Sequence, residues 1–210
     1  MNDEINGVGL VVGTDGWLSA ARRVPSPHAD ERPPGAQVSL IVIHGVSLPP
    51  GEFGGSWVED FFSGRLDRDT HPYFARLAAL RVAPHLYVQR DGALIQFVSC
   101  ARRAWHAGRS RWQGRDACND FSIGIELEGT DDIPYTDAQY ERLVSVIVAL
   151  HRHYPAIGEQ GVAGHSDIAP GRKTDPGPVF DWRHLTSKLA QAGYNFSREP
   201  IKNPSRDVES

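Results

Sequence analysis

The sequence has no apolar run long enough to cross a membrane. No stretch approaches the roughly 18 consecutive apolar residues that a membrane helix needs. Met1 to Glu4 is acidic where a secretory signal would be basic, and the apolar run Val8 to Val12 is short and contains Gly9. We therefore expect a protein that is not exported and that has no membrane partner.

The sequence also has few cysteines and no excess of basic residues. The 210 residues include two cysteines, Cys100 and Cys118, whereas secreted domains often carry several disulfides. We interpret both as reduced thiols, with a Cys100–Cys118 pair as the open alternative. The formal net charge of −4 argues against nucleic acid as the main partner, because phosphate binding needs a basic face. Together these features predict a cytoplasmic protein, and nothing indicates an obligate protein partner.

Strand-like and helical segments alternate along the chain without an internal repeat. This interleaving predicts a single α/β domain, with a central mixed β-sheet flanked by helices. We expect this domain to cover 16–193, with an N-terminal extension over 1–15 and a polar C-terminal tail over 194–210. A chain of this length is sufficient for one sizeable core.

Several segments are typical of strands. Residues 38–44 form a β-branched apolar run that indicates a buried central strand, and 161–165 indicate a short strand ending at a histidine. Two further runs, 85–90 and 93–98, are separated by Asp91-Gly92, a strong signal for a two-residue hairpin turn.

Residues 121–128 alternate between apolar and polar or small side chains. Three aliphatic residues share the face expected to meet the core: Ile123, Ile125 and Leu127. Glu126 and Glu128 share the opposite face with small residues. Strand geometry alone does not separate the two carboxylates, and either one is open to interpretation as a surface residue.

The strongest helix signal covers residues 137–153. Thr136 and Gln139 are spaced as a capping box, and the helix has an apolar stripe made of Tyr140, Leu143, Val144, Ile147 and Val148. A last helix is expected after Asp181 and should end at Gly193. Shorter helical segments are expected at 56–62 and 71–80.

Two histidines and a carboxylate have the composition of a catalytic zinc site. His44 and His165 each end a predicted strand, where ligands of α/β proteins tend to gather. Asp175 follows ten residues after His165 in a proline-rich loop. Two histidines, a carboxylate and a water make an open zinc site. Spacing alone leaves open the alternative that both histidines are structural.

Several longer motifs carry a family resemblance. They are Val42–His44, Ser47–Gly55, His71–Phe74, Ala104–Gly108, Asn119–Gly129, Gly164–His165 and Arg172–Pro178. On these motifs the chain resembles the AmpD family of N-acetylmuramoyl-L-alanine amidases over roughly residues 16–185. Wider relatives are the phage lysozyme-like amidases and the peptidoglycan-recognition proteins, which commonly have a cysteine where Asp175 stands here.

The resemblance implies a reaction and a residue for each role. The reaction is Zn²⁺-dependent hydrolysis of the amide between 1,6-anhydro-N-acetylmuramic acid and L-alanine in muropeptides, during cytoplasmic peptidoglycan recycling. His44, His165 and Asp175 are implied as zinc ligands. Glu126 is implied as the carrier of the attacking water's proton, and Lys173 as the stabiliser of the developing oxyanion, roles that suit their chemistry. Lys173 as an ordinary solvated lysine is the alternative.

Substrate-binding residues are expected around these groups. Muropeptides carry carboxylates, so Arg81 and Arg115 are candidates for binding them. The aromatic side chains of Tyr73 and Trp105 are candidates for packing against sugar or peptide. Two further histidines are expected to support the site by hydrogen bonding, His85 and His106. The remaining histidines are assigned to surface or structural roles: His28, His151, His153 and His184.

Two other functions are weighed against this enzyme. One is a non-catalytic module that binds muropeptides, and the other is an exported amidase that degrades intact wall. Non-catalytic modules often lack the third metal ligand, whereas Asp175, Glu126 and Lys173 are all present here. One position departs from the resemblance: Gly45 follows His44 where AmpD relatives often have asparagine.

Overall fold

The computed structural model describes residues 9–197 and is built around a six-stranded mixed sheet. The strand order is β1-β5-β4-β9-β3-β10, and only the β4–β5 pair is antiparallel. This confirms the predicted α/β fold with a central mixed sheet. The strands are β1 (Arg22–Arg23), β3 (Leu40–Val46), β4 (Leu86–Val88), β5 (Leu94–Gln96), β9 (Ser122–Glu128) and β10 (Val162–Gly164).

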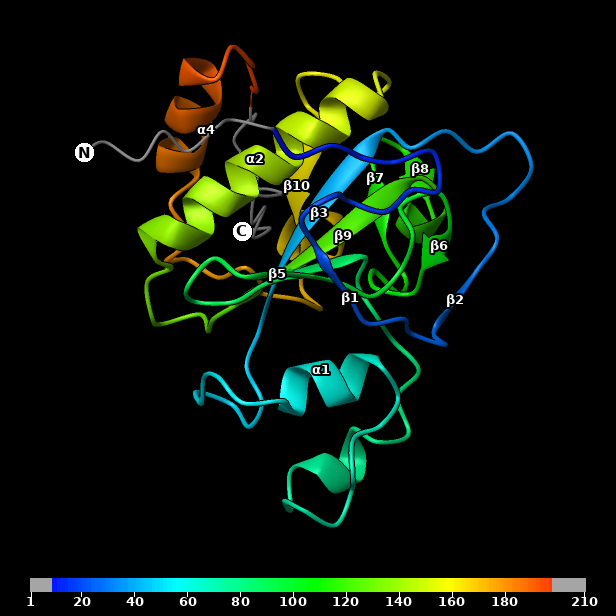
Figure 1. Cartoon of the computed structure of the whole chain (residues 1–210), viewed down its shortest axis with the longest axis vertical. Helices are drawn as coiled ribbons and strands as arrows, with labels where there is room; N and C mark the ends of the chain where they lie inside the picture. Colours follow the sequence, from blue (N-terminus) through cyan, green and yellow to red (C-terminus); the bar gives the residue numbers. More distant parts are fainter. Residues whose placement is uncertain (1–8, 198–210) are drawn as a thin grey trace, which may run out of the picture.

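Two helices cover one face of the sheet. The long helix α2 (Asp137–His153) lies beside α4 (Trp182–Gln191), as Figure 1 shows in yellow-green and orange. Their apolar side chains form one cluster with alternate residues of the central strands, including Ile43, Ile123 and Ile125. The main core of the molecule therefore lies between these helices and the sheet.

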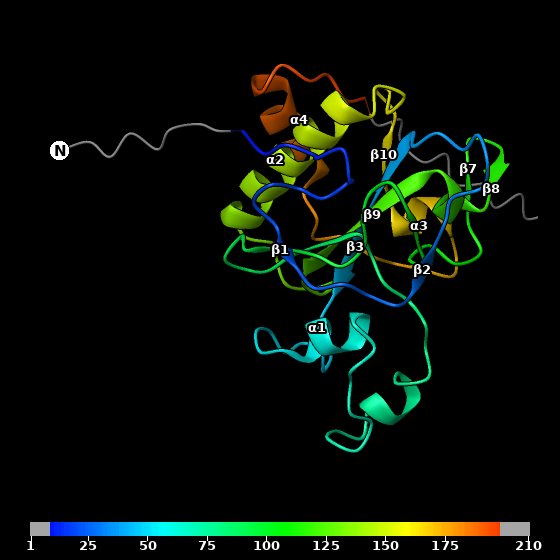
Figure 2. The same cartoon turned by 45° about the vertical axis from the view of Figure 1, so that its right-hand side comes forward.

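Shorter elements cover the opposite face and one end of the sheet (Figure 2). The first helix packs Phe61 and Phe62 against residues of β4 and β5. These shorter elements are α1 (Trp57–Phe62), α3 (His165–Ile168), the 3₁₀ turns Phe74–Arg76 and Cys118–Asp120, and the two small strand pairs β2 (Ala29–Asp30) with β6 (Arg103–Ala104) and β7 (Arg111–Trp112) with β8 (Arg115–Asp116).

The α2 helix has the predicted limits and the predicted capping box. The Thr136 hydroxyl accepts the Gln139 N–H at 3.2 Å, and the Gln139 side-chain oxygen accepts the Thr136 N–H at 3.1 Å. The stripe differs in part: Val144 and Val148 are only half-buried, because the face turned to the sheet continues instead through Val146 and Leu150 (full set of buried residues: Gln139, Tyr140, Leu143, Val146, Ile147, Ala149, Leu150).

Three local predictions need correction. The hairpin loop holds three residues rather than two, since Gln89 donates to the Ala93 carbonyl and Gly92 adopts φ +81°. The segment 71–80 was predicted to be a helix, but it consists of turns with a single 3₁₀ turn at Phe74–Arg76. Phe74 is the one fully buried residue of that segment, so it lacks the apolar face that stabilises a helix.

The third correction concerns the two histidines expected at strand ends. His44 lies inside β3, which continues to Val46 because that residue still pairs with Glu128 of β9. His165 begins α3 instead of ending β10, because the Asp167 carboxylate accepts the Gly164 N–H at 2.7 Å and starts the helix there.

Other predictions can be checked against the described residues. Cys100 and Cys118 are buried free thiols. Within residues 9–197, no helix has the length and apolar character required to span a membrane. The N-terminal extension and C-terminal tail fall partly outside this range, in 1–8 and 198–210. Inside it, Val12 belongs to the main core and Tyr194 packs against it.

Candidate active site

The parallel strands bring three of the predicted site residues to one end of the sheet. His44 of β3 is the register partner of Glu126 in the neighbouring strand β9. On the other side of β3, Gly164 of β10 pairs with Ile43, so His165 follows directly beside His44. Register partners in a parallel sheet place their side chains on the same face. This arrangement sets Glu126 and His165 on either side of His44.

The side chains of His44, His165 and Asp175 converge on one point. The Nδ1 atoms of His44 and His165 lie 2.9 Å apart, and the Oδ2 atom of Asp175 lies 3.2 Å from the first and 3.0 Å from the second. Asp175 reaches this point from the loop after α3, where its carbonyl accepts the Ser166 N–H at 2.9 Å. Three potential ligand atoms thus form a compact triangle.

The hydrogen-bond pattern assigns the Nδ1 lone pair of His165 to this triangle and is compatible with the same tautomer for His44. The Nε2 atom of His165 lies 3.2 Å from the Ala107 carbonyl, which only accepts, so Nε2 carries the proton and Nδ1 the lone pair. His44 Nε2 lies 2.9 Å from His106 Nδ1, and His106 Nε2 lies 3.1 Å from the Ser122 hydroxyl. When His44 Nε2 donates to His106 and His106 donates to the Ser122 hydroxyl, His44 Nδ1 keeps its lone pair as well; a Ser122 hydroxyl that donates instead reverses this chain.

Electrostatics agree with a neutral His44 ring beside an ionised carboxylate. Burial lowers the pKa of His44 to about 4, so its imidazole is neutral near pH 7. Burial raises the pKa of Asp175, but the contacts of its carboxylate with His165 and His44 outweigh burial and hold that pKa well below its usual range. The centre therefore offers a neutral His44 ring and an anionic carboxylate oxygen, with the Nδ1 lone pair of His165 beside them.

This donor set fits a zinc ion. Zinc in proteins takes histidine nitrogen and carboxylate oxygen at about 2.0–2.2 Å, and a tetrahedral site with such bonds separates its ligands by about 3.3 Å. The observed separations of 2.9–3.2 Å are close to that value. Each histidine also uses its second nitrogen in a hydrogen bond, as metal-bound histidines do. Three protein ligands leave the fourth position for water or substrate.

Glu126 borders this centre with a carboxylate that lacks a partner. Its Oε2 atom is buried and has no hydrogen-bond partner among residues 9–197. Burial raises the pKa of Glu126 well above its usual range, the Asp175 carboxylate adds to the rise, and the Lys173 ammonium opposes it. A carboxyl group with a raised pKa is suited to taking up and releasing a proton near neutral pH.

Glu128 has a different environment two residues along the same strand. Its carboxylate accepts the backbone N–H of Gly54 at 2.5 Å and that of Arg90 at 3.0 Å. The side chain is 2% exposed and ties β9 to the hairpin and to the loop before α1. The alternative that both glutamates lie on an open surface is therefore wrong for Glu128.

A cavity of about 580 Å³ opens beside the histidine centre. Its polar end holds Glu126, Lys173 and Asp175, whereas Tyr73 lies in the wall formed by α1 and the 3₁₀ turn. Lys173 is exposed, with no ion pair recorded for it in the described part of the chain. The apolar wall consists of Leu48, Phe61, Phe62, Leu77, Leu80 and Val82.

The structure does not bring the other three predicted substrate residues to this cavity. Trp105 donates its indole N–H to the Asp30 carboxylate at 3.1 Å. Arg81 lines a smaller cavity of about 320 Å³ beside His28. Arg115 lies over the Phe121 ring in a separate cavity of about 620 Å³.

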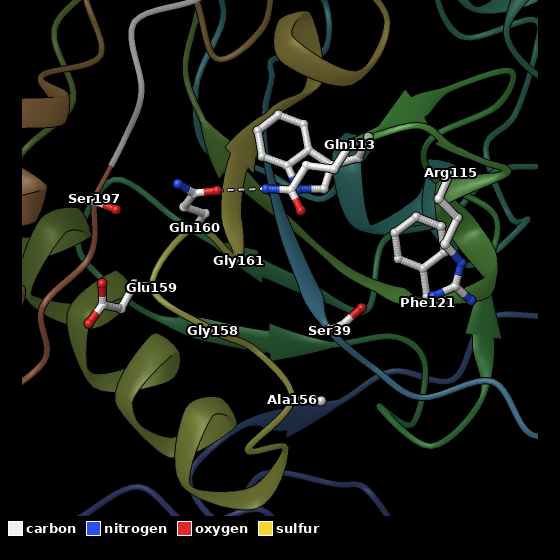
Figure 3. A pocket seen from close by; sticks show the side chains of 11 residues that line it. Ser39, Gln113, Arg115, Phe121, Ala156, Gly158, Glu159, Gln160, Gly161 and Ser197 are labelled. Carbon is white, nitrogen blue, oxygen red and sulfur yellow. Dashed lines mark hydrogen bonds between the residues drawn. The ribbon is translucent and has the colours of Figure 1, made fainter.

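That separate cavity lies at the far end of the parallel strands (Figure 3). Ser39 and Gly161, which border it, directly precede β3 and β10, whereas the histidine centre lies toward the other ends of these strands. One edge is closed by a hydrogen bond of 2.8 Å between Gln113 and Gln160. Contact of Arg115 with a molecule bound at the histidine centre is therefore not supported by its position.

The two predicted supporting histidines lie behind the centre. His106 contacts His44 directly, as described above. His85 is buried behind His106, with their ring centroids 5.6 Å apart. Its Nδ1 accepts the Gly124 N–H at 3.0 Å, and its Nε2 lies 3.0 Å from the Arg102 carbonyl. A Cβ atom on Gly124 would lie 2.4 Å from the His106 ring, so glycine is required there for this ring to pack.

Tyr135 is a residue near the site that the sequence did not indicate. Its hydroxyl donates to the carbonyl of Pro176, the residue after Asp175, at 2.9 Å. Forty residues separate Tyr135 from that loop, and Tyr135 precedes the α2 cap as an ordinary aromatic residue, so no local pattern indicated the contact.

Comparison with known proteins agrees with this geometry. Residues 34–178 match the N-acetylmuramoyl-L-alanine amidase family. The chain is 59% identical over 180 residues to the 1,6-anhydro-N-acetylmuramyl-L-alanine amidase AmpD of Citrobacter freundii, covering 86% of this chain and 96% of that one. A crystal structure of a selenomethionine AmpD derivative superposes with a TM-score of 0.80 at 57% identity, covering 82% of this chain and 96% of that chain.

A third similarity is to a complex with substrate. The amidase AmiD of Escherichia coli, in complex with anhydro-N-acetylmuramic acid-L-Ala-D-γ-Glu-L-Lys, superposes with a TM-score of 0.55 at 29% identity. The match covers 91% of this chain and 68% of that chain.

Proposed function

The chain belongs to the N-acetylmuramoyl-L-alanine amidase family, and we propose that it is a zinc enzyme that hydrolyses the amide between 1,6-anhydro-N-acetylmuramic acid and L-alanine in muropeptides. The observation that carries the proposal is the triangle of His44, His165 and Asp175 beside the unpartnered carboxylate of Glu126. High identity to AmpD relatives over most of the chain supports the anhydro sugar as part of the substrate.

His44, His165 and Asp175 would hold the zinc ion. When bound, zinc supplies Lewis-acid chemistry, since it acidifies a water molecule and polarises a carbonyl group. The Ala107 carbonyl keeps His165 in the tautomer that presents its Nδ1 lone pair, and donation from His44 Nε2 to His106 would do the same for His44.

Glu126 carries the proton in this mechanism. Its carboxylate takes a proton from the attacking water as the water oxygen bonds to the amide carbon. The same proton is then donated to the alanine nitrogen, so that the carbon–nitrogen bond breaks and a free amine leaves. The raised pKa of Glu126 suits both steps, because the group must accept a proton and release it again.

Lys173 opposes the negative charge that develops on the amide oxygen. Its position on the rim of the cavity, two residues before Asp175, supports this role. Tyr73 is proposed to contact the sugar or the peptide from the opposite wall. We assign no substrate contact to Arg81, Trp105 or Arg115, whose positions lie outside this cavity.

We further propose that the protein acts in the cytoplasm, in peptidoglycan recycling, with soluble muropeptides as its small-molecule partners. The two buried free thiols of Cys100 and Cys118 support a reducing compartment. The relatives named for the 1,6-anhydro sugar support a substrate that has already left the wall.

The test compares two substrates with and without a chelator. Purified protein is incubated with soluble anhydromuramyl peptide and with intact sacculi, and the released peptide is measured. We expect chelator-sensitive cleavage of the soluble substrate and at least tenfold less release from sacculi. Comparable release from both would indicate a wall-degrading amidase, and binding without release would indicate a non-catalytic module.

A further inference from the structure

Tyr135 fixes the backbone beside the carboxylate of the proposed zinc site. Its hydroxyl donates to the Pro176 carbonyl at 2.9 Å, and its side chain is buried. One peptide unit earlier, the Asp175 carbonyl accepts the Ser166 N–H at 2.9 Å. Two successive carbonyls are thus anchored, that of Asp175 to α3 and that of Pro176 to Tyr135, and both follow directly after the Cα atom that carries the Asp175 side chain.

Gly45 provides the space in which the Tyr135 hydroxyl lies. A Cβ atom at position 45 would be 2.4 Å from that hydroxyl oxygen, a separation that real Cβ atoms do not tolerate. The next nearest atoms, Pro176 Cα and Tyr135 Cζ, are both 3.7 Å away, which is ordinary van der Waals contact. The conflict is therefore with the hydroxyl oxygen alone.

The conformation of Gly45 gives no other reason for a glycine. Its φ angle is not positive, and it lies within β3 directly after His44. An alanine at this place would normally strengthen a strand, since glycine loses more backbone freedom on folding. The absence of a side chain at Gly45 is explained by the position of the Tyr135 hydroxyl.

From these contacts we infer that Tyr135 is a positioning residue for the third metal ligand, and that Gly45 is required because it leaves room for the Tyr135 hydroxyl. The inference rests on the proposed zinc site. The contact from Tyr135 to the Pro176 carbonyl holds the loop so that Asp175 Oδ2 stays near the nitrogen atoms of His44 and His165. Loss of that contact frees the carboxylate to move and weakens metal binding, while the two histidines remain in place.

Zinc affinity of the full chain tests this directly, with Tyr135→Phe as the variant. The substitution keeps the ring and removes only the hydroxyl. We expect the zinc dissociation constant, measured by competition with a chelating indicator, to rise about tenfold, the lower end of the range for groups that orient metal ligands. The visible absorption spectrum of the Co²⁺-loaded protein should also change, because it reports the geometry of the ligands.

Tyr140→Phe is the matched control. Tyr140 is also buried, also packs on Phe180, and its hydroxyl also bonds to backbone, accepting the Asp181 N–H at 2.7 Å. That bond lies at the start of α4, away from Asp175. The control should lose stability to a similar degree and keep the wild-type zinc affinity and Co²⁺ spectrum.

A double-mutant cycle separates positioning from general loss of structure. Gly45→Ala in the natural chain should also raise the zinc dissociation constant about tenfold, because the new methyl group displaces the Tyr135 hydroxyl. The same substitution in the Tyr135→Phe background should cause no further rise, since the nearest remaining atoms are 3.7 Å away. Additive effects in the two backgrounds would overturn the coupling.

The possible failures are distinguishable. A natural chain that binds no zinc would overturn the proposed function and this inference together. A natural chain that binds zinc, with Tyr135→Phe equal to it in affinity and in Co²⁺ spectrum, would overturn the positioning role alone. Equal weakening in Tyr135→Phe and Tyr140→Phe would also overturn it, because the effect would then follow from stability.

Discussion

Glu126 and Glu128 leave the same face of β9, yet only Glu128 has backbone donors at its carboxylate. Gly54 and Arg90 donate to Glu128, whereas the buried Oε2 of Glu126 has no partner within residues 9–197. The register of the sheet adds a second difference, since Glu126 pairs with His44 and Glu128 with Val46. The first carboxylate is thus placed for chemistry at the histidine centre, and the second holds two loops together.

Replacing each glutamate by glutamine should separate these roles. Glu126→Gln keeps the shape but removes the proton acceptor, so turnover should fall by roughly two to four orders of magnitude with zinc still bound. Glu128→Gln presents a neutral amide to two N–H donors, so it should cost about 1–3 kcal/mol of unfolding free energy and leave turnover within about tenfold. Turnover at matched zinc occupancy, with a denaturation curve for each variant, measures both. A nearly normal Glu126→Gln enzyme would contradict the assignment.

Removing the charge of Lys173 should slow the reaction without releasing the metal. Lys173→Met should lower turnover by about 10²–10³, the usual loss for one group that stabilises a developing oxyanion. Lys188→Met on α4, which does not line the cavity, is the control and should behave like the natural chain. Steady-state kinetics with a zinc assay decide the matter. Unchanged turnover in Lys173→Met would leave Lys173 as a solvated surface residue.

His85 should make the fold sensitive to acid. Burial lowers the pKa of His85 to about 3, with the nearby Arg32 cation contributing, and its Nδ1 is already occupied by the Gly124 N–H. Below the ordinary histidine pKa of about 6.5 the unfolded chain binds a proton that the folded chain refuses. The contribution of His85 to stability should therefore not change with pH above about pH 7, and it should fall as the pH drops from about 6 toward 3, by up to about 1.4 kcal/mol per pH unit.

Denaturation curves between pH 7 and pH 4 test this, with His85→Asn as the variant. Asparagine can still accept the Gly124 N–H but does not titrate, so the variant should be less stable at pH 7 and lose less stability on acidification. The exposed His153 serves as control, because His153→Asn should retain the natural slope. Equal slopes for His85→Asn and the natural chain would show that His85 does not contribute.

Elements defined by neighbouring residues were predictable from the sequence. The capping box at Thr136 and Gln139 and the alternation over 121–128 depend on contacts within a few residues, and both occur as expected. The hairpin was recognised, but its length was not, because an Asp-Gly pair also suits a three-residue loop in which glycine takes the left-handed position. The helix expected over 71–80 does not form, because most side chains of this segment do not pack against the rest of the protein, and that packing is set by the tertiary structure.

The grouping of the three proposed metal ligands was predictable from the sequence, but their contacts were not, and three of the four substrate-binding candidates do not line the cavity. The family resemblance pointed to His44, His165 and Asp175, and the sheet brings these three side chains together. What separates Glu126 from Glu128 is the register of β9 against β3 and the approach of the 48–55 loop, neither of which a single strand encodes. The same holds for Tyr135, whose partner Pro176 lies in a loop distant in the sequence.

Zinc titration of the metal-free enzyme tests the central claim most directly. Protein stripped with a chelator is given increasing zinc, and cleavage of soluble anhydromuramyl peptide is followed together with bound metal. We predict that activity rises in proportion to zinc and saturates at about one ion per chain. His44→Ala and Asp175→Ala should neither bind zinc tightly nor cleave. Full cleavage by the metal-free protein, or full zinc binding by both variants, would contradict the account.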